Sequence, residues 1–440
     1  MSTIKGFSKL SRTDKIAWLA KHFLTSNPLD IAREFSSFMH TSAETQRLFD
    51  GISENTLTNF YMPYGVAPNF VINGRTYVVP MVIEESSVVA AAASGAKFWS
   101  ERGGFHAEVV STKKVGHVHF IWSGDSEKLF DFFGQVKATL IEGVEEMTAN
   151  MQSRGGGLLD IELVDCTHLE ADYYQLKGTF ETCDAMGANF INSVLEAFAH
   201  ILESEIAVYK GFSGRERQVE IVMSILSNYT PESLVRAWVE CPVADLGAFD
   251  DSGLDAAKFA RRFNTAVKIA NVDPYRATTH NKGIFNGIDA VVLATGNDFR
   301  AIEACGHAYA ARNGVYSSLT KASVKKGMFR FEIEIPLAVG TVGGLTRLHP
   351  LSKRSLEMLG NPSARELMKI MACVGLAQNF AAVKALVTSG IQKGHMKMHL
   401  TNILNHFNAT EKEEEQALQY FADKTVSFSG VREYLGKVRG

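Results

Sequence analysis

Near the N-terminus, apolar residues recur at helical spacing and then give way to alternating positions, which predicts a helix followed by a β-hairpin. The helix is expected over 12–25, with Thr13 as its cap. The alternating segment 65–79 contains Asn73-Gly74, a dipeptide that favours a two-residue hairpin turn. An alanine-rich stretch over 85–94 then predicts a helix that packs closely against a neighbouring element.

A second region alternates between strand-like and helix-like patterns. The expected strands are 107–111, 116–121, 158–164 and 174–182, and the expected helices are 126–151 and 184–204. The order strand, strand, helix, strand, strand, helix is typical of a small α+β sheet domain of ferredoxin-like kind. We therefore expect a separate small domain over 105–217.

The rest of the chain is dominated by helical patterns. Long helices are expected over 255–270 and 363–389, with strands near 219–223 and 329–335. The end of the chain predicts a short helical segment, in which 410–415 is an acidic helix start. The predicted fold class is α+β, with a large helix-rich domain over 1–104 and 218–389, an inserted small domain over 105–217 and a C-terminal segment over 390–440.

Length, charge and composition narrow the class of protein. With 440 residues and 46% hydrophobic content, the chain can bury the cores of two or three domains. A net charge of −3 gives no global attraction to nucleic acid or to an anionic membrane. The N-terminal residues lack an apolar signal region, and no stretch long enough to span a bilayer is expected. We expect a cytoplasmic protein with no nucleic-acid or membrane partner.

Cysteine and histidine patterns argue against disulfide and metal chemistry. The five cysteines are Cys166, Cys183, Cys241, Cys305 and Cys373, an odd number without a CxxC pair. Cys183 is expected to be a small buried hydrophobe at a strand end rather than a nucleophile. His395 and His399 have the spacing of a helical metal pair, but no HExxH pattern accompanies them. No metal site is expected.

Two segments rich in glycine and small polar residues each contain one charged side chain. Lys282 stands between Asn281 and Gly283, and Asp298 follows Thr-Gly-Asn sixteen residues later. If the fold brings the two together, Asp298 keeps Lys282 protonated, and a fixed ammonium is suited to stabilise a developing oxyanion. The alternative is that both are exposed turn residues on a solvated loop.

The segment 184–189, Asp-Ala-Met-Gly-Ala-Asn, predicts a helix start that a phosphate can approach. A helix that begins here, directly after a strand, presents free backbone N–H groups and the positive end of its dipole. This suits a dinucleotide, although the GxGxxG pattern of a Rossmann site is absent, and a tightly packed helix cap is the alternative. Arg154, in the stretch 147–157 without Asp or Glu, weakly favours the 2′-phosphate of NADPH over NADH.

Several motifs occur in a characteristic order. They are Val79-Pro80-Met81 running into Glu84-Glu85, the segment 184–189, the Lys282 and Asp298 segments, the glycine-rich loop 340–346, and Gly394-His395-Met396. Together they resemble 3-hydroxy-3-methylglutaryl-CoA (HMG-CoA) reductase of class II, from about Ser53 to about Asn405. The resemblance implies a large substrate domain, an inserted ferredoxin-like dinucleotide-binding domain and a C-terminal helical flap. It also implies an oxidoreductase that converts HMG-CoA to mevalonate and CoA by two hydride transfers.

The resemblance also implies roles for individual residues. Lys282 is expected to stabilise the oxyanion of the mevaldyl-CoA hemithioacetal, and Asp298 to tune Lys282 and Glu85. Glu85 would supply a proton to the aldehyde oxygen, and His395 would protonate the departing thiolate. The expected substrate contacts are Ser87, Arg276, Thr279, Asn286, Gln378 and Asn379. The expected contacts with the cofactor, NADPH or NADH, are Asp184, Met186, Gly187, Asn189 and Arg154.

The expected oligomeric state and the expected direction of the reaction rest on the resemblance alone. Family members form their site at a subunit interface, so a homodimer or higher homo-oligomer is expected, with a flap from about 390 hinged at Gly390 and Gly394. Two departures from the family pattern are Ser86, where many relatives have proline, and Thr56-Leu57-Thr58, where they have Val-Ile-Gly. The open alternatives are mevalonate oxidation with NAD, reduction of another acyl-CoA, and a non-catalytic binding protein.

Overall fold

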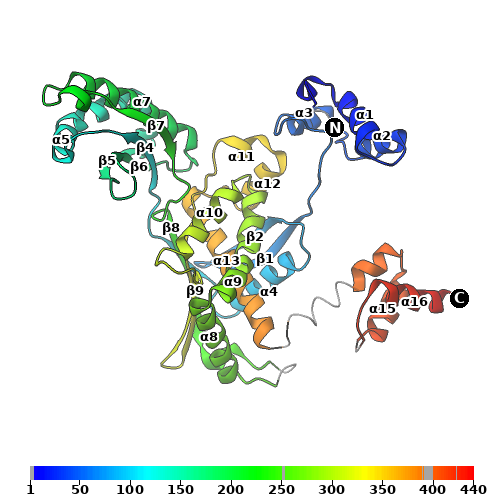
Figure 1. The fold of residues 1–440 in the computed structure, drawn as a ribbon. Helices are drawn as coiled ribbons and strands as arrows, with labels where there is room; N and C mark the ends of the chain where they lie inside the picture. Colours follow the sequence, from blue (N-terminus) through cyan, green and yellow to red (C-terminus); the bar gives the residue numbers. More distant parts are fainter. Residues whose placement is uncertain (1–3, 250–252, 389, 391–399, 423) are drawn as a thin grey trace.

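The computed structural model describes residues 4–249, 253–388, 390, 400–422 and 424–440. A central large domain carries the small domain on one side and the N-terminal helices on the other (Figure 1). The C-terminal helices form a further unit beside the large domain. The chain is thus an α+β protein, as predicted.

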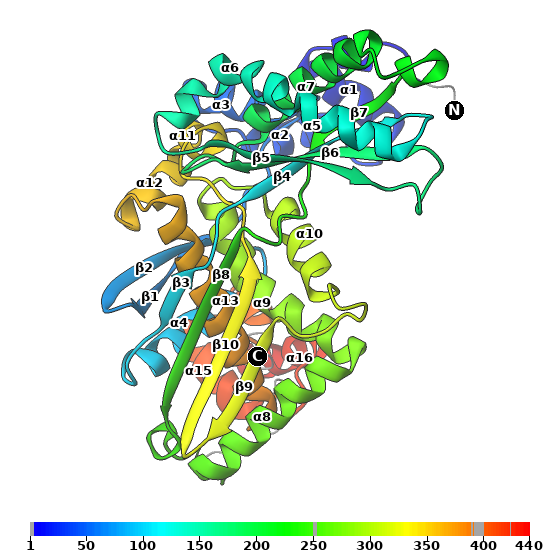
Figure 2. The same cartoon turned by 90° about the vertical axis from the view of Figure 1, so that its left-hand side faces the viewer.

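The large domain is built on a four-stranded antiparallel sheet that packs against helices. Its strands, in spatial order, are β3 (His106–Val109), β8 (Leu234–Pro242), β10 (Met328–Pro336) and β9 (Thr320–Lys325). Behind these strands run α13 (Ala364–Val387) and α9 (Pro274–Ala294) (Figure 2). Phe380 of α13 is fully buried, with its ring close to those of Trp99 and Phe263. These aromatic contacts hold the sheet and the helices in one core.

Helix α13 is long and apolar enough to cross a membrane, which the sequence analysis did not anticipate. However, 67% of the most apolar 18-residue stretch of this helix is buried inside the large domain. A helix that is apolar on almost every side is typical of the centre of a large core as well as of a membrane span. Here its neighbours are α9, α4 (Val88–Ser100) and the sheet.

The predicted hairpin is confirmed and packs on the same core. β1 (Tyr64–Ile72) and β2 (Arg75–Val82) pair antiparallel through Asn73 and Gly74, both of which have positive φ. The helix after the hairpin begins at Val88, not at Glu85, and extends to Ser100. Glu85 is therefore a loop residue. The other helices of this domain are α8 (Ala256–Val272), α10 (Phe299–Ala310), α11 (Gly344–Leu348) and α12 (Pro350–Met358).

The small domain has the ferredoxin-like topology, but with a different order of elements from the one predicted. Its order is β4 (Lys114–Ile121), α5 (Ser126–Glu142), α6 (Glu145–Gln152), β5 (Gly157–Asp165), β6 (Tyr173–Glu181), α7 (Ala188–Val208) and β7 (Glu220–Leu226). The strands pair antiparallel in the spatial order β5-β6-β4-β7. Helices α5, α6 and α7 cover one face of this sheet (Figure 2). This is the βαββαβ arrangement.

Strand pairing places two predicted strands in other sheets than expected. The strand expected at 107–111 belongs to the large sheet as β3, and the strand expected at 219–223 completes the small sheet as β7. The two connecting segments run side by side, because Val110 N–H donates to Leu234 O (2.8 Å) and Leu234 N–H donates to Ser111 O (2.9 Å). We propose that the small domain extends from about 112 to about 230 rather than over 105–217.

Two helix predictions also differ in detail. The helix expected over 126–151 is broken between α5 and α6 at Gly143, where a Cβ would lie 2.4 Å from Ile201 of α7. The N-terminal helix α1 (Arg12–His22) is confirmed, but its cap is Ser11 rather than Thr13, because the Ser11 hydroxyl accepts from Asp14 N–H. Helices α2 (Pro28–Ser37) and α3 (Ala43–Asp50) complete the N-terminal unit.

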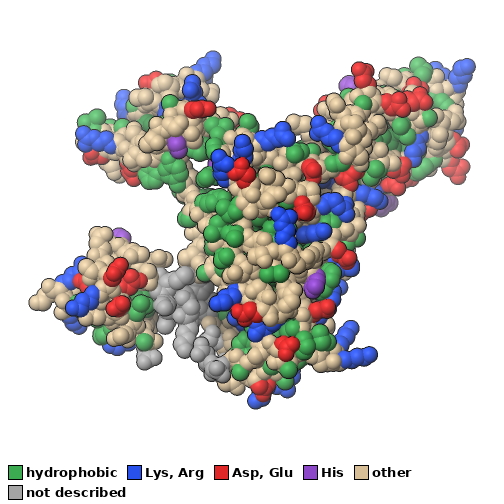
Figure 3. Space-filling view, turned by 180° about the vertical axis from the view of Figure 1, so that it is seen from behind, with side chains coloured by type: hydrophobic (Ala, Val, Ile, Leu, Met, Phe, Trp, Pro, Cys, Tyr) green, Lys and Arg blue, Asp and Glu red, His purple; other side chains and the backbone are tan. Residues whose placement is uncertain are grey.

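The C-terminal unit has its own small core. Helix α15 (Glu411–Tyr420) begins with a capping box between Thr410 and Glu413, which confirms the predicted acidic helix start. Apolar residues of α15 and α16 (Phe428–Arg439) pack with those of 400–404. On the face shown in Figure 3, basic and acidic side chains are interspersed over the lobes, in keeping with the small net charge.

Candidate functional site

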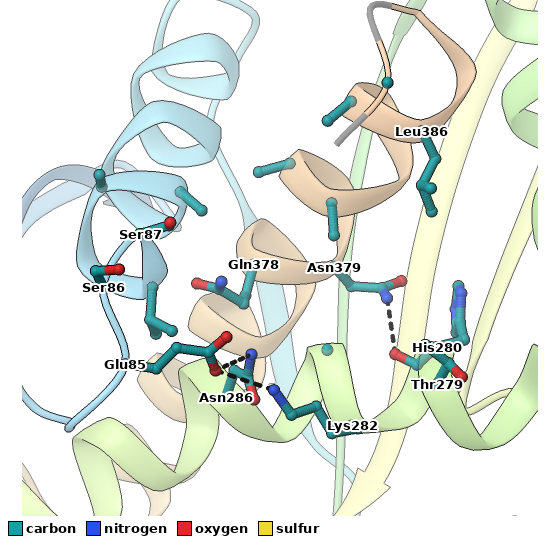
Figure 4. Close-up of a pocket in the computed structure, with 18 of the residues that line it drawn as sticks. Glu85, Ser86, Ser87, Thr279, His280, Lys282, Asn286, Gln378, Asn379 and Leu386 are labelled. Carbon is teal, nitrogen blue, oxygen red and sulfur yellow. Dashed lines mark hydrogen bonds and ion pairs between the residues drawn. The ribbon is translucent and has the colours of Figure 1, made fainter. Parts of the chain in front are cut away.

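The first cleft lies in the large domain between the start of α4, helix α9 and the C-terminal half of α13. It encloses about 530 Å3. Its lining contains the predicted residues Glu85, Ser87, Arg276, Thr279, Lys282, Asn286, Gln378 and Asn379. Residues far apart in the sequence thus meet in one place, as Figure 4 shows.

Two of the residues that line this cleft form an ion pair. Lys282 Nζ lies 3.0 Å from Glu85 Oε2, and Asn286 Nδ2 lies 3.5 Å from the same oxygen. Lys282 and Asn286 are one turn apart on α9 and share a face, whereas Glu85 comes from the loop before α4. Both charged side chains remain partly exposed, at 61% for Lys282 and 41% for Glu85. The cleft therefore offers an ammonium and a carboxylate in direct contact to a molecule that enters it.

Close packing of α9 on α13 brings the two side-chain amides to the cleft. A Cβ at Gly287 would lie 2.9 Å from Gln378 Cβ, so glycine permits this approach. Gln378 Oε1 is buried and has no hydrogen-bond partner among the described residues. Asn379 is already committed, because its Nδ2 donates to His280 O (3.1 Å) and its Oδ1 accepts from Thr320 Oγ1 (3.3 Å). Gln378 is thus the amide with a free acceptor.

Arg276 supplies a second positive charge to the cleft. It is half-buried, and burial lowers the pKa of its guanidinium. Within the described part of the chain, no carboxylate forms an ion pair with it. His280, one turn further on, also lines the cleft; burial and the charge of Arg276 lower its pKa to about 3. A neutral His280, bonded through Nε2 to Thr320 Oγ1 (2.6 Å), holds the end of β9 against α9.

The second cleft, of about 840 Å3, lies where the small domain meets the large one. Met186, Gly187 and Asn189 line it together with the glycine-rich loop 340–346 and the segment 296–300. Gly187 is the N-cap of α7, with φ of 88° and no side-chain cap. A Cβ at Gly340 would lie 2.6 Å from Met186 N, so the two loops can approach only because of glycine. An uncapped helix start facing a wide cleft suits a phosphate.

Two residues expected to contact the cofactor do not line this cleft. Asp184 Oδ1 accepts from Ala364 N–H (2.7 Å) at the start of α13, and its carbonyl accepts from Thr341 N–H (2.8 Å). Asp184 therefore ties the loop of the small domain to the large domain. Arg154 is exposed, and its carbonyl oxygen accepts from Cys183 Sγ (3.3 Å). Cys183 itself is only half-buried with φ of 51°, so the expectation of a small buried residue at this strand end was wrong.

Asp298 is not beside Lys282 within the chain. It lines the second cleft, where it caps α10 and pairs with Arg300 (3.1 Å between Nη2 and Oδ2). Burial opposes its ionisation, but hydrogen bonds from Arg300 and Ala301 outweigh burial and lower the pKa of Asp298. The separation follows from helix geometry, because Lys282 and the last residue of α9 are about 18 Å apart along the axis.

The remaining predictions concern the end of the chain and metals. His395, His399 and Gly394 lie outside the described residues. Among residues that the structure describes, no group of three His, Cys, Asp or Glu side chains is placed to hold a metal ion.

Sequence reasoning missed Lys114, which is buried beneath the loop 182–187. The only sequence signal for it was a lysine opening an otherwise apolar alternation over 114–121.

A helix-rich domain with a Lys–Glu cleft, joined to a ferredoxin-like domain with a glycine-lined cleft, defines a two-domain α+β enzyme of the dinucleotide-dependent type. The sequence model of the family described as hydroxymethylglutaryl-coenzyme A reductase matches residues 14–400. The chain therefore belongs to the HMG-CoA reductase family. The predicted family, and with it the predicted reductase activity on HMG-CoA, are confirmed at this level.

Individual relatives agree with this assignment. The chain is 36% identical to the 3-hydroxy-3-methylglutaryl-coenzyme A reductase of Archaeoglobus fulgidus, over 100% of this chain and 95% of the relative. It is 33% identical to the probable reductase of Borreliella burgdorferi, over 96% of each chain. A solved class II reductase from Streptococcus pneumoniae, bound to NADPH, is 37% identical with a TM-score of 0.71, and the match covers 88% of this chain and all of that one. The class II form predicted from the motifs is thus confirmed.

Proposed function

We propose that the first cleft binds HMG-CoA and that its residues carry out the reduction to mevalonate and CoA, with a dinucleotide held in the second cleft. The observation that carries this proposal is the contact between Lys282 and Glu85, with Asn286 beside it, in a cleft that also contains Arg276 and Gln378. Reduction of a thioester to an alcohol requires an oxyanion stabiliser and proton donors, and this set supplies both.

The cleft residues match the chemical groups of the substrate. The guanidinium of Arg276, which pairs with no carboxylate among the described residues, is suited to the carboxylate of the HMG group, because arginine can bind a carboxylate through two parallel hydrogen bonds. Gln378 Oε1, which has no hydrogen-bond partner in the described part of the chain, is suited to accept from the tertiary hydroxyl. Ser87 and Thr279 add hydroxyl groups to the lining. Asn379, whose amide is committed to His280 and Thr320, shapes the cleft instead.

In the proposed mechanism, the Lys282 ammonium faces the thioester carbonyl and stabilises the negative charge that develops on its oxygen, first in the hemithioacetal and later in the aldehyde. Glu85, in contact with Lys282, delivers a proton to the aldehyde oxygen as it becomes the alcohol, so its carboxylate has to take up a proton before the second hydride transfer. His395 is assigned the protonation of the departing CoA thiolate. The bound dinucleotide supplies the hydrides.

The second cleft has the features that a dinucleotide needs. The start of α7 offers backbone N–H groups without a side-chain cap, and glycines at 187 and 340 leave room for a pyrophosphate. Arg154 lies outside the lining, so its support for the 2′-phosphate of NADPH falls away. The proposal of NADPH as the cofactor is supported instead by the pneumococcal relative that binds it.

Parallel rate measurements test the proposed reaction and its cofactor. With saturating HMG-CoA, we expect the purified protein to oxidise NADPH at a kcat/KM at least about tenfold higher than that for NADH. Mevalonate should form with two equivalents of cofactor consumed. Faster oxidation of NADH would contradict the cofactor assignment, and no oxidation of either would contradict the assignment of substrate to the first cleft.

We further propose that the complete site forms between two subunits. Within one chain Lys282 and Asp298 line different clefts, yet a carboxylate beside Lys282 and Glu85 would hold the lysine charged. A symmetric dimer can bring the second cleft of one subunit to the first cleft of its partner. The C-terminal segment from 390, which includes His395, would then close over the site as a flap.

Removal of Arg276 should weaken substrate binding more than turnover. For Arg276→Ala we expect the KM for HMG-CoA to rise by about 10- to 100-fold, because a charge-assisted contact with the carboxylate is lost. Arg261→Ala, which removes an exposed arginine from α8, is the matched control and should leave the KM unchanged. Steady-state kinetics with varied HMG-CoA measure both. A wild-type KM for Arg276→Ala would contradict the proposed role.

A further inference from the structure

Lys114 is a buried lysine that none of the proposed catalytic steps uses. It opens β4, and only 5% of its surface is exposed. Its Nζ donates to Thr182 Oγ1 (2.6 Å), Ala185 O (2.9 Å) and Met186 O (2.9 Å). An ammonium has three N–H bonds, so all of its donors are used. Among the described residues it forms no ion pair, which means that a buried charge is held entirely by neutral oxygens.

These hydrogen bonds set the direction of the loop that leads into α7. In a trans peptide the C=O and the following N–H point in opposite directions. Because the carbonyl groups of Ala185 and Met186 face Lys114, the N–H groups of Met186 and Gly187 face away from it. Met186 and Gly187 both line the second cleft. Ala185 is bridged to Val342 beside Met186, so Gly187 N–H is the donor that the ammonium leaves toward the cleft.

The loop has little freedom to adopt another arrangement. Thr182 Oγ1, which accepts from Lys114, itself donates to Ala185 O (2.7 Å). A Cβ at Gly187 would lie 2.4 Å from Thr182 Cγ2, so the loop packs directly on this threonine. On the far side, Asp184 is bonded to Ala364 of α13. Lys114 is the charged member of this set of contacts. Its removal would take the Lys114 donor from Met186 O and would leave Ala185 O with the Thr182 hydroxyl alone.

Building on the proposed cofactor cleft, we infer that Lys114 is a positioning residue for the dinucleotide. Its ammonium holds the loop so that Gly187 N–H, before α7, faces the cleft in which a pyrophosphate would bind, and its positive charge would favour a bound anion. Loss of the ammonium should therefore reduce affinity for the cofactor without affecting the residues that touch HMG-CoA.

A pH dependence of cofactor binding follows from the same geometry. Burial lowers the pKa of Lys114 to about 8, while Glu181 and Cys183 oppose this shift. A bound anion stabilises the charged lysine and raises its pKa, so affinity is full below the pKa of the free protein and falls as the pH rises through 8. If only the charged form binds, the Kd should rise about tenfold between pH 7 and pH 9.

Other titratable groups near Lys114 do not account for such a change. Glu181 and Cys183 act on Lys114, and Arg154 acts on Cys183. Burial raises the pKa of the Cys183 thiol above its usual value. The variant Cys183→Ala removes the thiol altogether, so it should keep the wild-type pH dependence.

The test is the Kd of NADPH for the full chain, followed by cofactor fluorescence at pH 7 and pH 9. We expect Lys114→Met to raise the Kd at least about tenfold at pH 7, since a buried charged donor is lost. Its KM for HMG-CoA should stay within twofold of wild type. The matched control is Lys113→Met, which removes the adjacent, half-exposed lysine that pairs with Glu232. A wild-type Kd for Lys114→Met would overturn the inference.

Two further variants separate this inference from the assignment of the cofactor cleft. Ala188→Trp places a large side chain in the second cleft and should abolish NADPH binding. If it binds NADPH normally, the cleft assignment fails; if it does not bind while Lys114→Met does, only the role of Lys114 fails. Should Lys114→Met not fold, Lys114→Arg decides, because arginine keeps the charge but does not titrate. It should lose the weakening between pH 7 and pH 9, and retention of that weakening would overturn the inference.

Discussion

Lys282→Met should lower kcat for HMG-CoA reduction by about a thousandfold or more, because the variant loses the charge that stabilises the oxyanion at both hydride-accepting stages. Methionine matches lysine in length and removes only the ammonium. The side chain of Lys282 is 61% exposed and its partner Glu85 is 41% exposed. Loss of such a solvated pair should change stability by less than about 1 kcal/mol. The effect is therefore expected in the chemistry and not in the fold.

Initial rates together with thermal unfolding measure this result. Lys268→Met, at an exposed position of α8, is the matched control and should retain the wild-type rate. The Kd of NADPH should be the same in both variants, since Lys282 lines the first cleft only. A folded Lys282→Met protein with a rate within tenfold of wild type would show that another group stabilises the oxyanion.

Two inactive variants should restore activity when their subunits are mixed. Lys282→Met disables the first cleft, and Asp298→Asn disables the carboxylate of the second cleft while asparagine still caps α10. In a hybrid dimer one of the two shared sites then contains an intact Lys282 and an intact Asp298. Equal mixing, with free exchange of subunits, should give about a quarter of wild-type activity, because half of the dimers are hybrids with one working site each.

The measurement is the reductase rate after the two variants are unfolded together and refolded, compared with each variant treated alone. No recovery, with hybrid dimers demonstrated by differential tagging, would mean that Lys282 and Asp298 act within the same subunit. In that case, α10 would have to move so that Asp298 reaches Lys282 of the same subunit. Recovery well above a quarter would indicate that sites in one dimer do not act independently.

Local sequence patterns predicted single helices, strands and turns better than they predicted which elements pair or pack together. The Asn73-Gly74 turn, the acidic start of α15 and the long helices α8 and α13 follow from residues adjacent in sequence. Strand β3 was assigned to the wrong sheet, because alternation identifies a strand without identifying its neighbour. The break at Gly143 depends on the approach of Ile201 from α7, which no local pattern contains.

The residues of the first cleft could be predicted because they lie in recognisable sequence motifs. The hydrogen bonds that each of them forms could not be predicted. Sequence alone did not separate Gln378, with a free acceptor, from Asn379, whose amide is committed to His280 and Thr320. Asp184 was expected to contact the cofactor, but its carboxylate accepts a hydrogen bond from the start of α13. Lys114 was overlooked because a lysine in a strand is usually exposed. Each of these depends on a long-range contact.

The paired segments at Val110-Ser111 and Leu234 bear on how this family can diversify. Because the chain leaves and rejoins the large domain at hydrogen-bonded neighbours, β3 and β8 would remain adjacent whatever length of sequence is inserted between them. The small domain is thus an insertion whose two ends lie side by side in the large domain. Changes within the inserted domain can therefore alter its side of the second cleft without changing how β3 and β8 pair in the large domain.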